Sequence, residues 1–354
     1  MIENESSSET ESNLFALCKP TGILAKALYS GRKVVFLCME LFLLTAFLSW
    51  NCEFWFSPST EGKIYCSIYI IYQLIHGIFI FLLYRNRNKY IDCFNYFESN
   101  VKIDELCPSL VNYLKKHRLV KMITMLMSFA CYFSVAVIVM VRHFSSNNDY
   151  LQCIDIFTFV FKMIGVSCAL VFRSFFVETC LYIQSCFIQV EHQISSTKRL
   201  SIDSIRQMRR MYCTAIETTE MINSLFIPVT GFYFTVSIVE SHFSFVNAIV
   251  NPSLAVMFIF IGESLSFSLT IYHIIYINHL ATRINKPVYL LSFKTDLLNV
   301  SKELQILMTR ITHADVGLTF LGIFVITPTC VTSLATISLT IALATPTLKT
   351  YLIA

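Results

Sequence analysis

Residues 114–142 read LKKHRLVKMITMLMSFACYFSVAVIVMVR, a basic run that ends at Lys121 and is followed at once by 20 residues without a charge. A helix of about 20 apolar residues crosses the hydrocarbon core of a bilayer. Lys and Arg residues stay on the cytoplasmic side of such a helix. This stretch therefore predicts a transmembrane helix that leaves the cytoplasm after Lys121.

The same alternation of basic and apolar segments continues along the chain. Seven apolar spans are long enough to cross a bilayer, at 34–55, 64–84, 122–142, 156–178, 223–247, 253–277 and 318–345. Of the 27 Lys and Arg residues, 22 lie in the N-terminal segment 1–33 and in loops 85–121, 183–222 and 279–317. This distribution predicts a cytoplasmic N-terminus, a cytoplasmic position for the three loops, and a short extracellular tail, 346–354.

The expected fold class is an all-α membrane protein with seven transmembrane helices, N-terminus cytoplasmic, C-terminus extracellular, with cytoplasmic helical extensions. The extensions are expected because residues 183–222 carry apolar side chains at helical spacing. The alternative is a set of separate amphipathic helices that lie on the membrane surface. A single seven-helix domain, residues 1–354, is expected, since only 14% of the residues are charged and 55% are hydrophobic.

The chain lacks the patterns of an enzyme or a metal protein. It has no phosphate-cradling glycine loop and no recognisable catalytic or metal-ligand spacing, so neither a cofactor nor a metal is expected. The net charge of +4 follows from the cytoplasmic loops and does not predict nucleic-acid binding. A disulfide among Cys52, Cys66 and Cys153, which are expected at the outer face, is left open.

Three segments carry a family resemblance. The runs MYCTAIETTEMINSLF (211–226), KELQILM (302–308) and TFLGIFVI (319–326) resemble the insect gustatory receptor family, within the wider insect chemoreceptor superfamily. The end of the last span departs from the family pattern of Thr-Tyr, five apolar residues and Gln-Phe. Here Thr340 is followed by Ile341, and Thr347 and Leu348 stand in place of Gln-Phe.

The resemblance implies a function and an assembly. It implies a gustatory receptor in the plasma membrane of sensory neurons that acts as a ligand-gated, non-selective cation channel for a small-molecule tastant. Four identical or related subunits would form a homo- or hetero-tetramer around one pore, with the seventh span of each lining it. Two alternatives stay open: a G-protein-coupled type of seven-helix receptor, and a membrane transporter or structural protein that does not gate.

The seventh span carries a row of small hydroxyl side chains. They recur at three- and four-residue spacing and therefore share one helix face: Thr329, Thr332, Ser333, Thr336 and Thr340. With the resemblance, this face is predicted to line the pore, and ordinary helix packing is the alternative. Pro328 is expected inside this helix, where it would permit bending.

Charged residues inside membrane spans are costly and are candidates for function. The topology places several of them, with aromatic neighbours, in one outward-facing polar pocket. The candidate ligand-binding residues are His76, Lys162, Phe232, Tyr233, Glu240, His242, Glu263 and Phe267. The alternative is that opposite charges pair to hold the helices together, for example Arg173 with Glu263.

Overall fold

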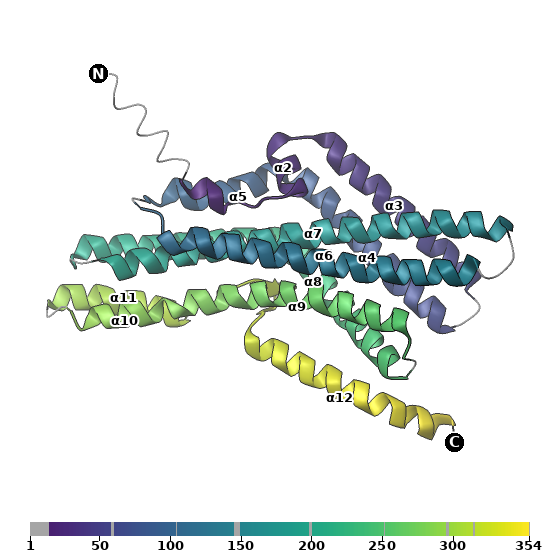
Figure 1. Cartoon of the computed structure of the whole chain (residues 1–354). Coiled ribbons are helices and arrows are strands. Elements are labelled where there is room, and N and C mark those ends of the chain that lie inside the picture. Colours follow the sequence, from purple (N-terminus) through teal and green to yellow (C-terminus); the bar gives the residue numbers. More distant parts are fainter. Residues whose placement is uncertain are drawn as a thin grey trace.

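The protein is described by a computed structural model in which almost every element is a helix (Figure 1). The described residues are 14–57, 60–103, 105–144, 149–197, 200–250, 252–294, 297–313 and 316–353. They form, in order, η1 (Leu14–Cys18), α2 (Ile23–Ser30), α3 (Lys33–Phe56), α4 (Thr60–Arg85), α5 (Arg87–Asn100), α6 (Pro108–Phe144), α7 (Asp149–Ser196), α8 (Ile202–Val250), α9 (Leu254–Arg283), α10 (Asn285–Ser292), α11 (Leu298–His313), β1 (Thr319–Phe320), β2 (Phe324–Val325) and α12 (Pro328–Ile353).

Five helical segments of the described chain are long and apolar enough to cross a membrane. They lie in α3, α4, α6, α7 and α9 with α10. Helix α8 provides a sixth if its two arms count as one span, because they meet at a bend of 59°. The bend falls at Pro228, which lacks the amide hydrogen that an unbroken helix needs. These spans make the chain a multi-pass membrane protein.

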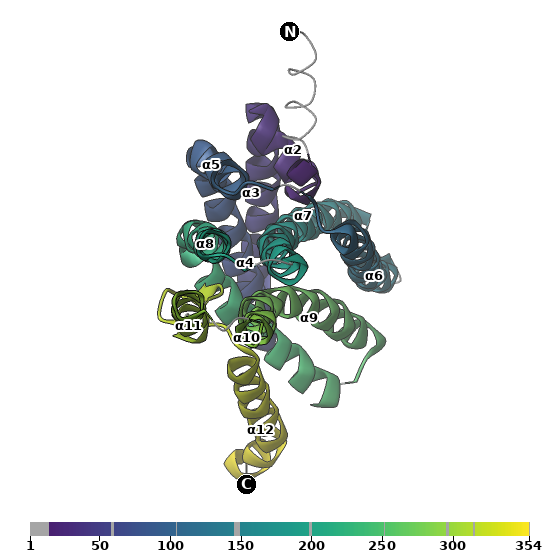
Figure 2. The same cartoon turned by 90° about the vertical axis from the view of Figure 1, so that its left-hand side faces the viewer.

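Two helices run far beyond the thickness of a bilayer. Helix α7 has 48 residues and α8 has 49, and both pass without interruption through residues expected in the cytoplasmic loop 183–222. The prediction that membrane helices continue into this loop is confirmed, and the alternative of separate surface helices is wrong for it. The two long helices are the scaffold on which the shorter ones pack (Figures 1 and 2).

The N-terminal elements pack on α7 through aromatic side chains. Phe15 of η1 lies 5.3 Å from Phe97 of α5 and 6.1 Å from Tyr182 of α7, measured between ring centroids. The Tyr182 hydroxyl donates a hydrogen bond of 2.8 Å to the carbonyl of Phe94. Large buried rings dominate packing energy, so this cluster holds η1 and α5 against the scaffold.

A buried carboxylate completes that attachment. Glu178 of α7 is fully buried and pairs with two cations of α6, Arg118 at 3.1 Å and Lys121. It also accepts a hydrogen bond from the Thr21 amide at 3.1 Å. Arg118 donates in turn to the carbonyls of Leu17 and Lys19. One carboxylate therefore joins α6, α7 and the N-terminal segment.

The seventh span differs from its expected form. Residues 319–325 form a two-stranded antiparallel hairpin, with Thr319 opposite Val325, so the prediction of helix from 318 is wrong there. Pro328 begins α12 and does not interrupt it, so the predicted bend is absent from the described helix. A first helical position suits proline, because its missing amide hydrogen is not needed there. The helix continues to Ile353, beyond the expected end at 345.

Helix α12 stands apart from the bundle. It leaves the hairpin near the middle of the molecule and diverges from the other helices (Figures 1 and 2).

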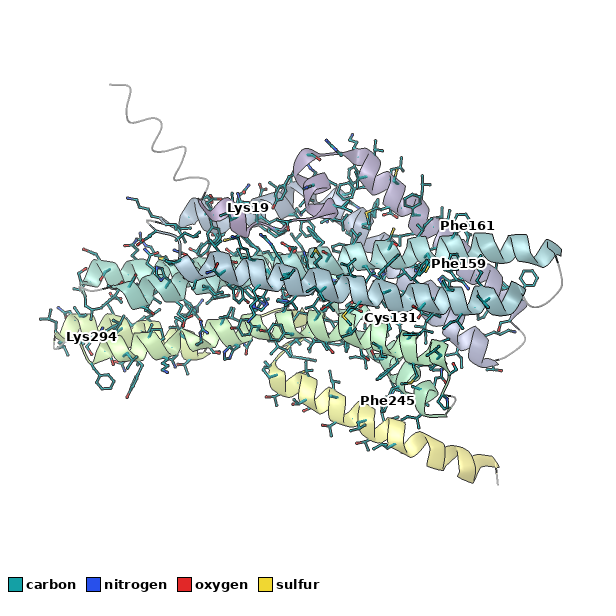
Figure 3. The ribbon with its side chains drawn as sticks, viewed as in Figure 1. Lys19, Cys131, Phe159, Phe161, Phe245 and Lys294 are labelled. Atoms are coloured by element: carbon teal, nitrogen blue, oxygen red, sulfur yellow. The ribbon has the colours of Figure 1, made fainter. Side chains whose placement is uncertain are left out.

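Lys294 marks the end of the molecule that holds α10 and α11, whereas Phe159 and Phe161 of α7 lie toward the opposite end (Figure 3). Of the three cysteines expected at the outer face, Cys52 and Cys66 are free thiols, and the side chain of Cys153 lies outside the described residues.

The Glu178 network generates a stability prediction. Glu178→Gln would leave Lys121 and Arg118 without their counter-ion, and breaking a buried ion pair costs about 3–5 kcal/mol. We expect a clear fall in the unfolding temperature of the detergent-purified protein. The matched control is Glu191→Gln, since Glu191 pairs with Arg283 at the exposed surface, where such pairs contribute about 1 kcal/mol or less. Equal unfolding temperatures for the two variants would contradict this role.

Candidate functional site

Two helices present facing rows of polar and aromatic side chains in the core. On α4 the row contains Tyr69, Tyr72 and His76, and on α8 it contains Tyr233 and Glu240. The spacings of three, four and seven residues place each row on one helix face. The rows meet where the Tyr72 hydroxyl lies 3.4 Å from the Ser237 hydroxyl, and the rings of Tyr72 and Tyr233 lie 5.9 Å apart.

Arg173 of α7 occupies the centre of this cluster. Its side chain is 2% exposed and forms an ion pair with Glu263 of α9 at 3.0 Å. It also donates hydrogen bonds to the hydroxyls of Tyr72 and Ser266. The guanidinium carbon lies 5.4 Å from the ring centroid of Tyr72 and 5.7 Å from that of Tyr233. The pairing of Arg173 with Glu263, the structural alternative considered from the sequence, is therefore present.

The cluster is not saturated with hydrogen bonds. Five of its buried atoms have no hydrogen-bond partner among the described residues, namely both carboxylate oxygens of Glu240, Nε2 of His76, Nε of Arg173 and the Tyr233 hydroxyl. Nearly all buried polar atoms in proteins find a partner. In a core of aromatic rings, such a group of unpaired atoms is typical of a binding site for a polar molecule.

The other sequence candidates lie around this cluster or away from it. Phe267 packs on Phe234 with ring centroids 6.0 Å apart. His242 is half-buried, and Phe232 is 60% exposed, so it lies away from the cluster. Lys162 is engaged elsewhere, since it pairs with Glu53 of α3 and lies 4.2 Å above the Trp50 ring.

The hairpin before α12 is fastened to α8. The Asn223 side chain accepts a hydrogen bond of 2.9 Å from the Thr319 amide and donates one of 3.0 Å to the Thr319 hydroxyl. Thr230 donates to the Thr319 carbonyl at 3.3 Å. The turn brings Leu321 over Gly231, where an added Cβ would lie 2.1 Å from a Leu321 methyl carbon. Helix α8 thus carries both one wall of the polar cluster and the attachment of α12.

The hydroxyl face of α12 is exposed along its described length. Thr329, Thr332, Ser333, Thr336 and Thr340 are all exposed. The hydroxyls of Thr332, Thr336 and Thr340 each donate to a carbonyl one turn earlier, at 2.8–3.0 Å. Because their protons are used in this way, the oxygen lone pairs remain free to face outward. Such a surface is suited to contact with cations.

Sequence reasoning did not find the hairpin or its attachment. The residues that form the turn are Leu321 and Gly322, which both have positive φ angles, 52° and 74°. The glycine is a turn signal, but it lies in an apolar run that also fits a membrane helix. Tyr72 and Ser266 were likewise missed as partners of Arg173, because neutral residues in apolar spans carry no distinctive sequence signal.

Comparison with known proteins identifies the fold class as that of the insect olfactory receptors. The chain is similar to the insect olfactory receptor OR5 from Machilis hrabei, with a TM-score of 0.67, 13% identity, and coverage of 97% of this chain and 98% of that one. The structure of OR5 in complex with eugenol gives a TM-score of 0.69, 12% identity and the same coverage. No family model and no curated protein sequence matches.

A double-mutant cycle tests the central ion pair. Arg173→Met and Glu263→Leu each leave one buried charge unpaired, and we expect each to lower the free energy of unfolding by about 3–5 kcal/mol. The double variant should lose clearly less than the sum, since no unpaired charge from this ion pair remains. Thermal or denaturant unfolding in detergent measures the three losses. Simple additivity would mean that the two residues do not interact.

Gly231→Ala tests the attachment of the hairpin. The new methyl group overlaps Leu321, and overpacking of this kind costs about 1–3 kcal/mol. Stability should return when Leu321→Ala is added, because the smaller side chain makes room. Gly77→Ala is the control, since its Cβ would meet only the Glu40 carboxylate, at 3.5 Å. No rescue by Leu321→Ala would show that the hairpin does not rest on Gly231.

Proposed function

We propose that the chain is a chemosensory receptor of the insect chemoreceptor superfamily, of the gustatory type, and that it acts as a ligand-gated, non-selective cation channel. The observation that carries the proposal is the fold, which is similar to that of an olfactory receptor over 97% of this chain and 98% of the other. The three gustatory-type segments at 211–226, 302–308 and 319–326 support the subtype.

The ligand site in this proposal is the polar cluster between α4, α7, α8 and α9. It would take a small-molecule tastant, as the related receptor takes eugenol in its complex. Of the residues selected from the sequence, His76, Tyr233, Glu240 and Glu263 belong to the cluster. Phe267 lies beside it through Phe234. His242 is half-buried on another face of α8, Phe232 is exposed, and Lys162 pairs with Glu53. Arg173 and Tyr72 join the proposed site.

In this proposal, helix α8 couples ligand binding to channel opening. A ligand that separates α4 from α8 would move the arm of α8 that carries Tyr233 and Glu240. Asn223, Thr230 and Gly231 hold the hairpin of α12 near the bend of the same helix. A change at the bend would therefore displace the start of α12. Such a displacement would open the pore that α12 is proposed to line.

The pore would be formed by α12 of four subunits, in a homo- or hetero-tetramer of related receptors. A row of hydroxyl oxygens can solvate a passing cation without trapping it. The separation of α12 from its own bundle leaves this face available to other subunits. The proposed location is the plasma membrane of sensory neurons, with seven spans counting α12, the N-terminus in the cytoplasm and the C-terminus outside.

Whole-cell recording tests the channel and the pore face together. We expect a rapid cation current during a panel of sugars and bitter compounds, with G-protein signalling blocked. Thr336→Ala and Thr340→Ala should each change relative cation permeability about two- to tenfold, the range expected for loss of one hydrogen-bonding oxygen. Thr309→Ala is the matched control, since this exposed α11 hydroxyl also donates to a carbonyl one turn earlier. Current that disappears under the block would instead favour a G-protein-coupled receptor.

A further inference from the structure

The described part of the membrane core contains carboxylates without an ion-pair partner, and Glu240 is the most deeply buried of them. Arg173 pairs with Glu263, and Lys162 pairs with Glu53. Glu240 is 2% exposed, and no described cation forms an ion pair with it. Its neighbour His242 is two positions along α8, which places the two side chains on different faces of the helix.

Burial makes this unpaired carboxylate costly. A charge in a low-dielectric interior is tolerated when it is paired and hydrogen-bonded. The Tyr69 hydroxyl and the Arg173 guanidinium face Glu240, yet neither of its oxygens has a hydrogen bond of good geometry among the described residues. The Arg173 guanidinium, which faces the cluster, is already engaged by Glu263, Tyr72 and Ser266. Two carboxylates of the cluster, Glu240 and Glu263, therefore share one described cation, Arg173, whose remaining donor without a described partner is Nε.

Two further buried atoms of α4 without a described partner are acceptors. Nδ1 of His76 lies 2.7 Å from the Tyr72 carbonyl, and only a protonated nitrogen can bond to a carbonyl oxygen. In the neutral ring Nε2 is then an acceptor, and it has no partner among the described residues. The Oε1 atom of Gln73, on the same turn of α4, is also buried without a described partner. A complementary group must supply several donors and a positive charge.

Aromatic rings border the same region. Phe172 lies 4.9 Å from the His76 ring and 5.8 Å from the Tyr233 ring, between centroids. Trp50 stacks on Tyr69 at 4.5 Å. Aromatic faces attract organic cations and also bury the apolar body of a ligand. This combination of an unpaired carboxylate, acceptors and rings fits an organic ammonium ion.

We propose that Glu240 is the recognition residue for a protonated amine, whose ammonium group donates hydrogen bonds to this carboxylate while its apolar part lies against the rings of α4, α7 and α8. The inference rests on the proposed function only in taking this cluster as the ligand site. It adds the chemical class of the ligand, a small aromatic or aliphatic amine, and the residue that selects it.

The test uses a matched pair of probes, 2-phenylethylamine and 2-phenylethanol, on the purified full chain in detergent at neutral pH. They differ only in the group that would face Glu240. We expect the amine to raise the unfolding temperature of the wild-type protein, since a ligand stabilises the state it binds, and the alcohol to raise it less. In Glu240→Gln the apparent dissociation constant of the amine should rise about 30-fold or more, as for loss of one member of a buried charge pair.

The control variant is Glu53→Gln, which removes a carboxylate that already has a partner and should leave the amine response unchanged. Equal stabilisation by amine and alcohol in the wild-type protein would overturn the proposal, even if Glu240→Gln does not fold. So would an unchanged response in a folded Glu240→Gln, or equal stabilisation by sodium ions alone. Unfolding does not depend on channel opening, so silence in the current assay leaves this result intact.

Discussion

The ion pair between Arg173 and Glu263 is the interaction on which the core depends. It joins α7 to α9, and the hydrogen bond from Arg173 to Tyr72 adds α4. Removing these charges from water is expensive, so they are retained only where their partners are held in place. The helices must then pack in one register, because a shift by one turn would separate the pair and leave two charges in an apolar interior.

The same electrostatic requirement explains the arrangement of the molecule as a whole. Near the N-terminal elements, Glu178 is neutralised by Arg118 and Lys121 and fastens the first described residues to α6 and α7. Before Arg173 along α7, Lys162 pairs with Glu53 of α3. Helix α7 therefore carries charged contacts at three positions along its length, Lys162, Arg173 and Glu178. Unlike Glu178, Glu263 and Glu53, Glu240 forms no ion pair with a described residue, which is why the proposed ligand chemistry rests on it.

The part proposed to form the pore is organised differently from the core. Helix α12 meets the bundle chiefly through its preceding hairpin, held by Asn223 and Gly231 of α8. Its exposed hydroxyl face gains little from contact within a single chain. An element fastened at one end and left open along its side is suited to move with α8 and to pack against other subunits.

The sequence by itself determined the class of protein and the continuous helices, because span length, charge bias and apolar periodicity are local properties that the bilayer imposes directly. It also gave the pairing of Arg173 with Glu263 as one alternative, since the topology put both at similar depth. Only the tertiary structure decided that Lys162 turns to Glu53, that Glu240 is left unpaired, and that a hairpin precedes α12. These outcomes depend on helix rotation and on contacts between residues such as Gly231 and Leu321, about ninety positions apart, which no local pattern records.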